Sequence, residues 1–189
     1  MPEVVGVVAV QGDFEKHLKA LADLESTPTC REVRTPEDLE GCTRIILPGG
    51  ESTTVGLLMQ RYGLGEALRQ RILAGMPTWG TCMGMILLAR AVEGRTQWTL
   101  GVLDVVVRRN AFGAQVHSFE SEVPVKGLDE PVMGVFIRAP IITEVGPGVE
   151  VLSEIDGKVV AVRQGAILGT SFHPELTDDR RLHEWFLTL

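Results

Sequence analysis

The first half of the chain alternates apolar runs with amphipathic helical patterns, and this alternation limits the possible folds most. Strands are predicted at the apolar runs 4–10 and 45–47, with a weaker candidate at 29–34. Helices are predicted at 14–24, where apolar residues form one stripe, and at 65–74. Strands that alternate with helices in this way form a parallel sheet covered on both faces. The expected fold class is therefore α/β.

The second half contains short apolar runs separated by turn residues, so a strand-rich region is predicted from residue 101 onward. The expected strands lie at residues 102–107, 120–125, 132–136, 149–155, 159–163 and 167–171. Asp156-Gly157 suits a type I′ turn and predicts a hairpin. A helix is expected at 180–189. Because no linker-like stretch divides the 189 residues, a single domain spanning 1–189 is expected.

Composition and charge argue against several classes of function. The chain has 18 Lys and Arg against 25 Asp and Glu, a net charge of -7, and no basic cluster with interleaved aromatics, so no nucleic-acid partner is expected. No apolar run approaches the roughly 18 residues of a membrane span, and the first residues lack a positively charged leader, so a cytoplasmic protein is expected.

The cysteines do not form a metal-binding or disulfide pattern. The three are Cys30, Cys42 and Cys82, and none belongs to a Cys-x-x-Cys pair. Neither a metal nor another cofactor is therefore expected. Cys30 and Cys42 are predicted to pack in or near the core.

Cys82 stands apart because it lies between two glycines, in Gly80-Thr81-Cys82-Met83-Gly84. A short extended segment precedes it and an apolar helix start follows it, so it is predicted at a sharp turn from strand to helix. At a helix N-terminus the unpaired N–H groups and the helix dipole favour the thiolate, the reactive form of cysteine. The alternative is a buried and inert cysteine, which is common.

Histidine is the side chain best suited to activate a thiol near neutral pH. His17 and His183 fall in predicted helices, where an exposed position or a surface hydrogen bond is expected, and His117 in a polar loop is a weak candidate. His173 follows the apolar run 167–172 and precedes Pro174-Glu175. In an extended segment residues i and i+2 point to the same side, so Glu175 is predicted to contact the His173 ring.

Two strand ends are expected to meet at this site. Parallel strands place ligands outside their C-terminal ends, so Cys82 and His173 are predicted at one edge of the sheet. Another glycine-rich loop, residues 48–52, follows the strand at 45–47 and is expected to end at a helix capped by Ser52, Thr53 or Thr54. By itself this loop is equally consistent with an ordinary tight turn.

Residues 80–84 together with His173-Pro174-Glu175 resemble the class I, or triad, glutamine amidotransferases. This resemblance implies a flavodoxin-like three-layer sandwich with a central mixed, mostly parallel sheet. Further motifs resemble the glutaminase subunits of pyridoxal 5′-phosphate synthase: residues 9–12, 47–54, 109–113, 118–120 and 136–140. Ala114 departs from that family, in which an arginine is common at this position.

The resemblance implies a glutaminase that converts L-glutamine to L-glutamate and ammonia through a thioester. Cys82 would attack the amide carbon, His173 would transfer protons, and Glu175 would orient His173. The backbone N–H groups of Gly50 and Met83 are the candidate oxyanion donors. The residues expected to bind glutamine are Gly50, Glu51, Ser52, Arg109, Ile137 and Arg138.

The resemblance also implies a partner, a separate synthase (lyase) subunit with a (β/α)₈ barrel, in a large hetero-oligomer that makes pyridoxal 5′-phosphate (vitamin B6). Partner contact is expected at Gln11-Gly12 and the first helix, and docking is expected to complete the oxyanion hole.

Three alternatives remain open from the sequence. One is a glutaminase of the same class serving another synthase, such as that of imidazole glycerol phosphate. Another is a stand-alone cysteine hydrolase. The third is a non-enzymatic flavodoxin-like binding module in which Cys82 only packs.

Overall fold

The computed structural model describes residues 2–113 and 118–189. Ala114 and His117 lie outside the described residues. The strands are β1 (Val4–Val8), β2 (Thr29–Val33), β3 (Arg44–Leu47), β4 (Thr78–Thr81), β5 (Ala89–Val92), β6 (Leu103–Arg108), β7 (Ser118–Val123), β8 (Val132–Ile137), β9 (Ile141–Val145), β10 (Glu150–Ile155), β11 (Lys158–Gln164) and β12 (Ile167–Thr170). The helices are α1 (Phe14–Ala22), α2 (Ser52–Arg61), α3 (Leu64–Leu73), α4 (Met83–Leu88) and α5 (Arg181–Phe186), with 3₁₀ turns η1 (Glu37–Leu39) and η2 (Pro174–Leu176).

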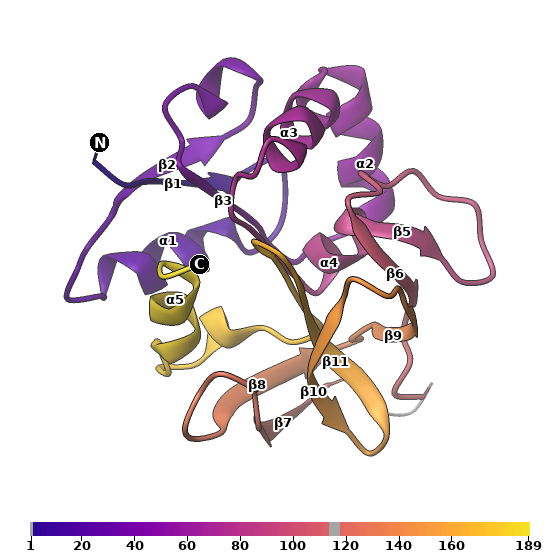
Figure 1. Cartoon of the computed structure of the whole chain (residues 1–189). Helices are drawn as coiled ribbons and strands as arrows, with labels where there is room; N and C mark the ends of the chain where they lie inside the picture. Colours follow the sequence, from indigo (N-terminus) through magenta and orange to yellow (C-terminus); the bar gives the residue numbers. More distant parts are fainter. Residues whose placement is uncertain (1, 114–117) are drawn as a thin grey trace.

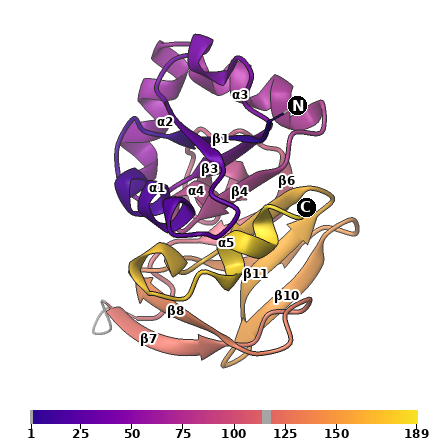
Figure 2. The same ribbon diagram turned by 90° about the vertical axis from the view of Figure 1, so that its left-hand side faces the viewer.

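The described residues form a 10-stranded mixed sheet in the order β2-β1-β3-β4-β12-β11-β9-β6-β5, with β10 paired to β11. The strands from β2 to β12 are parallel, as the alternating pattern predicts. The next three pairs, β12 with β11, β11 with β9 and β9 with β6, are antiparallel. Strands β7 and β8 form a separate two-stranded sheet, which lies at the lower end of the molecule in both views (Figures 1 and 2).

Helices cover both faces of the central sheet, which gives three layers. One buried cluster joins α2, α3 and α4 to the sheet, and the other joins α1, α5 and the β7–β8 sheet to its opposite face (Figures 1 and 2). Strand β3 illustrates why: Ile45 and Leu47 belong to the first cluster, while Ile46 belongs to the second. Successive side chains of a strand point to opposite faces, so a continuous apolar strand is buried on both.

The hairpin predicted at Asp156-Gly157 is confirmed. It joins β10 to β11, and both turn residues have positive φ, 49° for Asp156 and 73° for Gly157, as a type I′ turn requires. Two strands escaped prediction. Strand β5 follows directly after α4, which is only six residues long and ends at Leu88. Strand β9 is defined mainly by its pairing with the distant strand β6.

The predicted cap of α2 needs correction. The cap of α2 is Glu51, whose carboxylate accepts the backbone N–H groups of Thr53 and Thr54 at 3.1 and 2.7 Å; Ser52 is already inside the helix. The prediction that Cys30 and Cys42 pack in or near the core is confirmed, since Cys42 belongs to one buried cluster and the half-buried Cys30 packs against the other. No helix among residues 2–113 and 118–189 has the length and apolar character needed to cross a membrane.

Candidate active site

Cys82 lies at the turn between β4 and α4, as predicted. Its backbone has φ 51° and ψ -107°, a positive-φ conformation that is strained for any residue with a side chain. Its N–H donates to the carbonyl of Thr170 in β12 at 2.8 Å, which fixes the turn to the neighbouring strand. The side chain is only 8% exposed.

The two glycines beside Cys82 are required by close approach of the backbone. A Cβ on Gly80 would lie 2.5 Å from the carbonyl carbon of Gly84. A Cβ on Gly84 would lie 1.8 Å from the carbonyl oxygen of Leu47 in β3. Because real Cβ contacts are longer, only glycine allows α4 to start this close to the sheet.

His173 reaches the same edge because β12 pairs in parallel with β4, with Thr170 opposite Thr81. The His173 N–H donates to the Val135 carbonyl of β8 at 2.7 Å, which anchors the loop after β12. The expected extended geometry is wrong at Glu175, which lies in η2. The short turn nevertheless brings its carboxylate to the imidazole.

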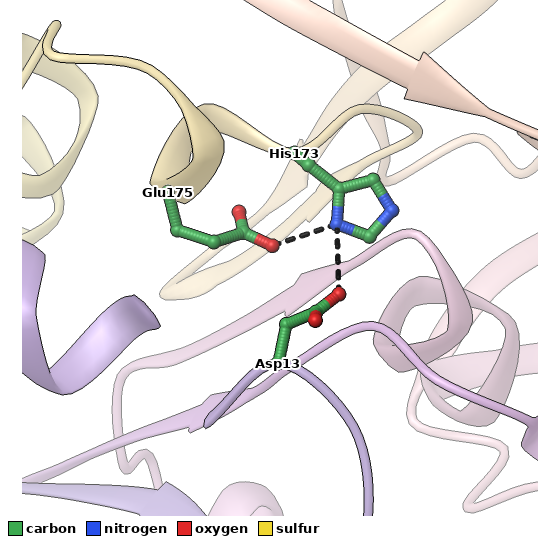
Figure 3. Close-up of side chains that lie close together, drawn as sticks. All are labelled: Asp13, His173 and Glu175. Carbon is green, nitrogen blue, oxygen red and sulfur yellow. Dashed lines mark hydrogen bonds and ion pairs between the residues drawn. The ribbon is translucent and has the colours of Figure 1, made fainter. Parts of the chain in front are cut away.

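His173 and Glu175 form a buried hydrogen-bonded pair (Figure 3). The His173 Nδ1 lies 2.7 Å from Glu175 Oε1, and the two residues are 4% and 3% exposed. The Nε2 atom lies on the far side of the ring from Glu175 (Figure 3) and is left for Cys82, which lines the same cavity as His173. Cysteine, histidine and glutamate thus lie in the order that a nucleophile, a base and an orienting carboxylate require.

The environment favours a charged imidazole. Burial opposes the charged form, but hydrogen bonds to Cys82 and Glu175 outweigh it and raise the pKa of His173 to about 10. Burial raises the pKa of the Glu175 carboxyl, while the hydrogen bond and charge of His173 act in the opposite direction. A cationic His173 stabilises negative charge on the neighbouring sulfur, so the site is suited to nucleophilic attack by Cys82.

Asp13 is a second carboxylate beside His173. Its Oδ2 lies 3.7 Å from Nδ1 and approaches that nitrogen from a different direction than Glu175 does (Figure 3). Asp13, His173 and Glu175 are close enough together to be considered as metal ligands. However, a Nδ1 that donates its proton to Glu175 has no lone pair left for a metal. The absence of a metal stays a prediction.

A cavity of about 280 Å³ opens beside Cys82 and His173. It is lined by Asp13, Gly50, Glu51, Ser52, Cys82, Met83, Ile86, Arg109, Asn110, Ile137, Arg138 and His173. Every predicted site residue lines it except Glu175, which lies behind His173. Asp13, Ile86 and Asn110 were not predicted, although the positive φ of Asn110, 50°, explains why this type of residue follows Arg109.

The glycine-rich loop after β3 is hydrogen-bonded to the loop before α1. Asp13 donates its backbone N–H to the Gly49 carbonyl at 3.1 Å, and Glu51 donates its own to Gln11 Oε1 at 3.2 Å. Gly12 has φ 105°, and a Cβ there would lie 1.8 Å from the Gly49 oxygen. The two loops therefore depend on each other for their conformations.

The two cavity arginines differ in how they are held. Arg109 faces the Glu51 carboxylate at 3.4 Å, with Thr53 and Gln97 oxygens at 3.5 and 3.4 Å. Arg138 is exposed, has φ 45°, and makes no ion pair or side-chain hydrogen bond with any described residue. Within the described parts of the chain, Arg138 is therefore the cavity cation left available for an anionic ligand.

Glu51 is kept ionised although it borders the cavity. Burial opposes the charge, but the backbone N–H groups and hydroxyls of Thr54 and Thr53 lower the pKa of Glu51 to about 2. Its negative charge at the start of α2 is also favoured by the helix dipole. Its contact with Arg109 is therefore that of two charged groups.

A three-layer α/β fold that brings a cysteine, a histidine and a glutamate together in this arrangement is the combination typical of triad-type glutamine amidotransferases. Residues 7–189 match the SNO glutamine amidotransferase family. The chain belongs to this family.

Relatives match along nearly the whole chain. A protein of Thermus thermophilus named "Pyridoxal 5'-phosphate synthase subunit PdxT" is 53% identical over 191 residues, covering 100% of this chain and 98% of the relative. A protein of the same name from Acidothermus cellulolyticus is 52% identical over 193 residues, covering 98% of this chain and 92% of the relative.

Solved structures agree with the predicted fold. One described as "Crystal structure of glutamine amidotransferase" has a TM-score of 0.92 and 50% identity, and the match covers 97% of each chain. PurLQS from Thermotoga maritima, at 16% identity, has a TM-score of 0.70 over 99% of this chain and 98% of its own, and shows the fold alone. The predicted flavodoxin-like sandwich is confirmed.

Proposed function

We propose that this chain is the glutaminase subunit of a pyridoxal 5′-phosphate synthase, hydrolysing L-glutamine to L-glutamate and ammonia. The observation that carries the proposal is the Cys82–His173–Glu175 arrangement at the wall of a cavity. Relatives that bear this subunit's name over nearly their full length support the choice of synthase. The glutaminase serving imidazole glycerol phosphate synthesis is not favoured, because the named relatives belong to the other pathway.

The mechanism follows from the order of the three side chains. Cys82 Sγ bonds to the carboxamide carbon of glutamine while His173 holds the thiol proton. The C–N bond then breaks, and His173 gives that proton to the departing ammonia, leaving a thioester. Water, deprotonated by His173, attacks the thioester, the C–S bond breaks, and glutamate leaves as the sulfur recovers its proton. Glu175 keeps the ring in one tautomer and stabilises its positive charge.

The tetrahedral intermediates need donors for their oxyanion. Met83 is the first residue of α4, so its backbone N–H has no acceptor within the helix. Gly50 has φ 155°, and a Cβ on it would lie 3.2 Å from Gly12 Cα and 3.3 Å from Met83 Cε, which favours glycine at this position. We assign the two backbone N–H groups as oxyanion donors, each worth a factor of roughly 10²–10³ in rate.

The remaining predicted residues form the glutamine pocket in this proposal. Arg138 binds the α-carboxylate, since it has no protein partner among the described residues. Arg109 shapes the pocket through Glu51, and Ser52, with its hydroxyl 2.8 Å from Gln97 Nε2, belongs to the same wall. Ile137 supplies a carbonyl 3.9 Å from Cys82 Sγ.

Replacing Arg138 with alanine is expected to raise the KM for glutamine about 10-fold to 100-fold with little change in kcat, because a charge-assisted hydrogen bond to the α-carboxylate is lost. Steady-state ammonia release measures both constants. Arg163→Ala, on β11, is the matched control. A KM that stays at the wild-type value in Arg138→Ala would exclude this assignment.

The partner is a synthase subunit with a (β/α)₈ barrel, in a large hetero-oligomer. Contact is assigned to the Gln11-Gly12 loop and α1, because Gln11 is hydrogen-bonded to the backbone N–H of Glu51, next to the candidate oxyanion donor Gly50. The chain acts as one glutaminase domain of residues 1–189. A cytoplasmic location stays a prediction.

Ammonia release from glutamine by the chain alone and with the synthase subunit is the test of the proposal. The synthase subunit is expected to raise the rate about 10-fold or more, because docking orders an oxyanion donor. In Gln11→Ala the stimulation is expected to fall, while the basal rate changes less. No ammonia release in either condition would overturn the glutaminase assignment. Equal rates with and without the synthase would favour a stand-alone hydrolase.

A further inference from the structure

A second buried polar cluster lies directly behind the triad and has no part in the mechanism above. His17 of α1, His183 of α5 and Thr81 of β4 are each 0% exposed. His17 Nδ1 lies 3.0 Å from His183 Nε2, and His17 Nε2 lies 3.2 Å from Thr81 Oγ1. The Trp79 ring packs edge-on against both rings, with its centroid 5.7 Å from that of His17 and 4.9 Å from that of His183. The expectation that both histidines lie at the surface is therefore wrong.

Glu175 connects this cluster to the triad. Its Oε1 accepts from His173, but its Oε2 is buried and has no hydrogen-bond partner of good geometry among the described residues. His17 Nε2 lies 3.4 Å from that oxygen. A buried carboxylate oxygen without a donor is costly, so the adjacent imidazole nitrogen is the group placed to satisfy it.

The tautomers of the two histidines follow from counting protons. If His17 carried its proton on Nδ1, its Nε2 lone pair would face the Glu175 carboxylate, and the remaining N–H of His183 would be buried without an acceptor. If both rings carry the proton on Nε2, His183 donates to His17 and His17 donates towards Glu175 and Thr81. This arrangement leaves only the lone pair of His183 Nδ1 unused, which costs less than an orphaned donor.

We propose that His17 is a positioning residue for the catalytic glutamate: its Nε2–H holds Glu175 Oε2, so that Oε1 stays aimed at His173, and His183 fixes the tautomer of His17. The inference rests on the proposed glutaminase function. It extends the chain of contacts from Cys82 through His173, Glu175 and His17 to His183, from the nucleophile to α1 and α5.

Both histidines are neutral at working pH, which suits this role. Burial, with His183 and His173 as further causes, lowers the pKa of His17 well below its usual value. Burial, with Arg180 second, lowers the pKa of His183 to about 3. A neutral ring can donate through only one nitrogen, so the direction of the hydrogen bonds is fixed.

The test compares His17→Leu, which removes the donor, with His17→Gln, whose amide N–H₂ reaches the position of Nε2. Ammonia release is measured with the synthase subunit present. His17→Leu is expected to lower kcat about 10-fold to 100-fold with KM nearly unchanged, and His17→Gln to restore most of it. A packing role alone would not make Gln better than Leu.

The pH profile gives a second readout. The described titratable groups facing Glu175 are His173 from its own loop, Asp13 from the loop before α1 and His17 from α1. Removing a donor from a carboxylate raises its pKa, so the acidic limb of kcat/KM moves to higher pH in His17→Leu. In His17→Gln the acidic limb of kcat/KM is expected at the same pH as in wild type.

His183 gives a coupling test. His183→Leu is expected to lower kcat less than His17→Leu does, and the double variant to lose no more than His17→Leu, because His183 acts through His17. Thermal unfolding of each variant separates loss of folding from loss of positioning. ¹H–¹⁵N spectra of the wild-type imidazole rings test the tautomers without activity: both rings are expected as Nε2–H.

The outcomes separate this inference from the proposed function. A wild-type assembly that releases no ammonia would end the proposed function, while the ring spectra still test the hydrogen-bond order. An active wild type with a folded His17→Leu of equal kcat and equal acidic limb would overturn the positioning role. An Nδ1–H tautomer at His17 would overturn it as well.

Discussion

Replacement of Cys82 by alanine is expected to lower the rate of ammonia release from glutamine by at least about 10⁴-fold, because no other described side chain at the cavity can form the thioester. Some catalysis is expected to remain from the cavity and the oxyanion donors. The fold should be retained, since alanine is smaller and fits the same backbone turn. Ammonia release by the assembled enzyme and circular dichroism measure the two effects.

Cys30→Ala is the matched control for that experiment. Cys30 is a half-buried cysteine of β2, outside the cavity, so its replacement is expected to leave the rate within about twofold of wild type. If folded Cys82→Ala kept a rate close to wild type, the thioester mechanism would be wrong. The same result would return Cys82 to the role of an inert core residue.

Glu175→Gln is expected to lower kcat about 10³-fold to 10⁴-fold while leaving KM nearly unchanged. An amide can turn its N–H₂ towards His173 Nδ1 and hold the wrong tautomer, and it cannot stabilise the imidazolium. Glu175 also contributes to the raised pKa of His173. Without the carboxylate, His173 loses its proton at lower pH, so the alkaline limb of the pH profile is expected to move to lower pH.

Glu184→Gln is the matched control, because Glu184 is an exposed glutamate of α5 and does not line the cavity. Its kcat and pH profile should equal those of wild type. A Glu175→Gln variant with an unshifted alkaline limb and nearly full kcat would show that the carboxylate does not orient His173.

The parts of the fold that could be predicted carry strong local signals. The apolar runs 4–10 and 45–47 were predicted as strands, and the buried parallel strands β1 (Val4–Val8) and β3 (Arg44–Leu47) lie there, because continuous apolar runs bounded by turns suit a sheet covered on both faces. Cys82 and the pair His173-Glu175 were predicted for a similar reason, since each follows a strand. Parallel pairing of β4 with β12 then brings them to one edge.

The predicted surface positions of His17 and His183 were wrong because histidine was taken as a polar residue that stays at the surface of a helix. His17 occupies the same helical face as Phe14 and Leu21, at a spacing of three and four residues, and His183 lies three residues before Phe186. The spacing alone indicates burial. The polar rings can be buried because each is hydrogen-bonded to a residue of a distant element. Those hydrogen-bond partners cannot be recognised from a single sequence.

The placement of the other cavity residues depends on long-range contacts. Ile137 and Arg138 were expected only through the family resemblance, and they reach the cavity of Cys82 because Val135 of β8 accepts the N–H of His173. Asp13 enters because its loop is hydrogen-bonded to Gly49. These contacts join segments more than 30 residues apart, and no local pattern marks them.

Covalent labelling with a glutamine analogue tests the central claim most directly. In the analogue a diazomethyl ketone replaces the carboxamide, so attack by a thiol forms a C–S bond and releases nitrogen gas. Peptide mapping is expected to find one label per chain, on Cys82, with labelling slowed by glutamine and absent in Cys82→Ala. Labelling of another residue, or labelling of Cys82 that glutamine does not slow, would contradict the assignment of Cys82 as the nucleophile for glutamine.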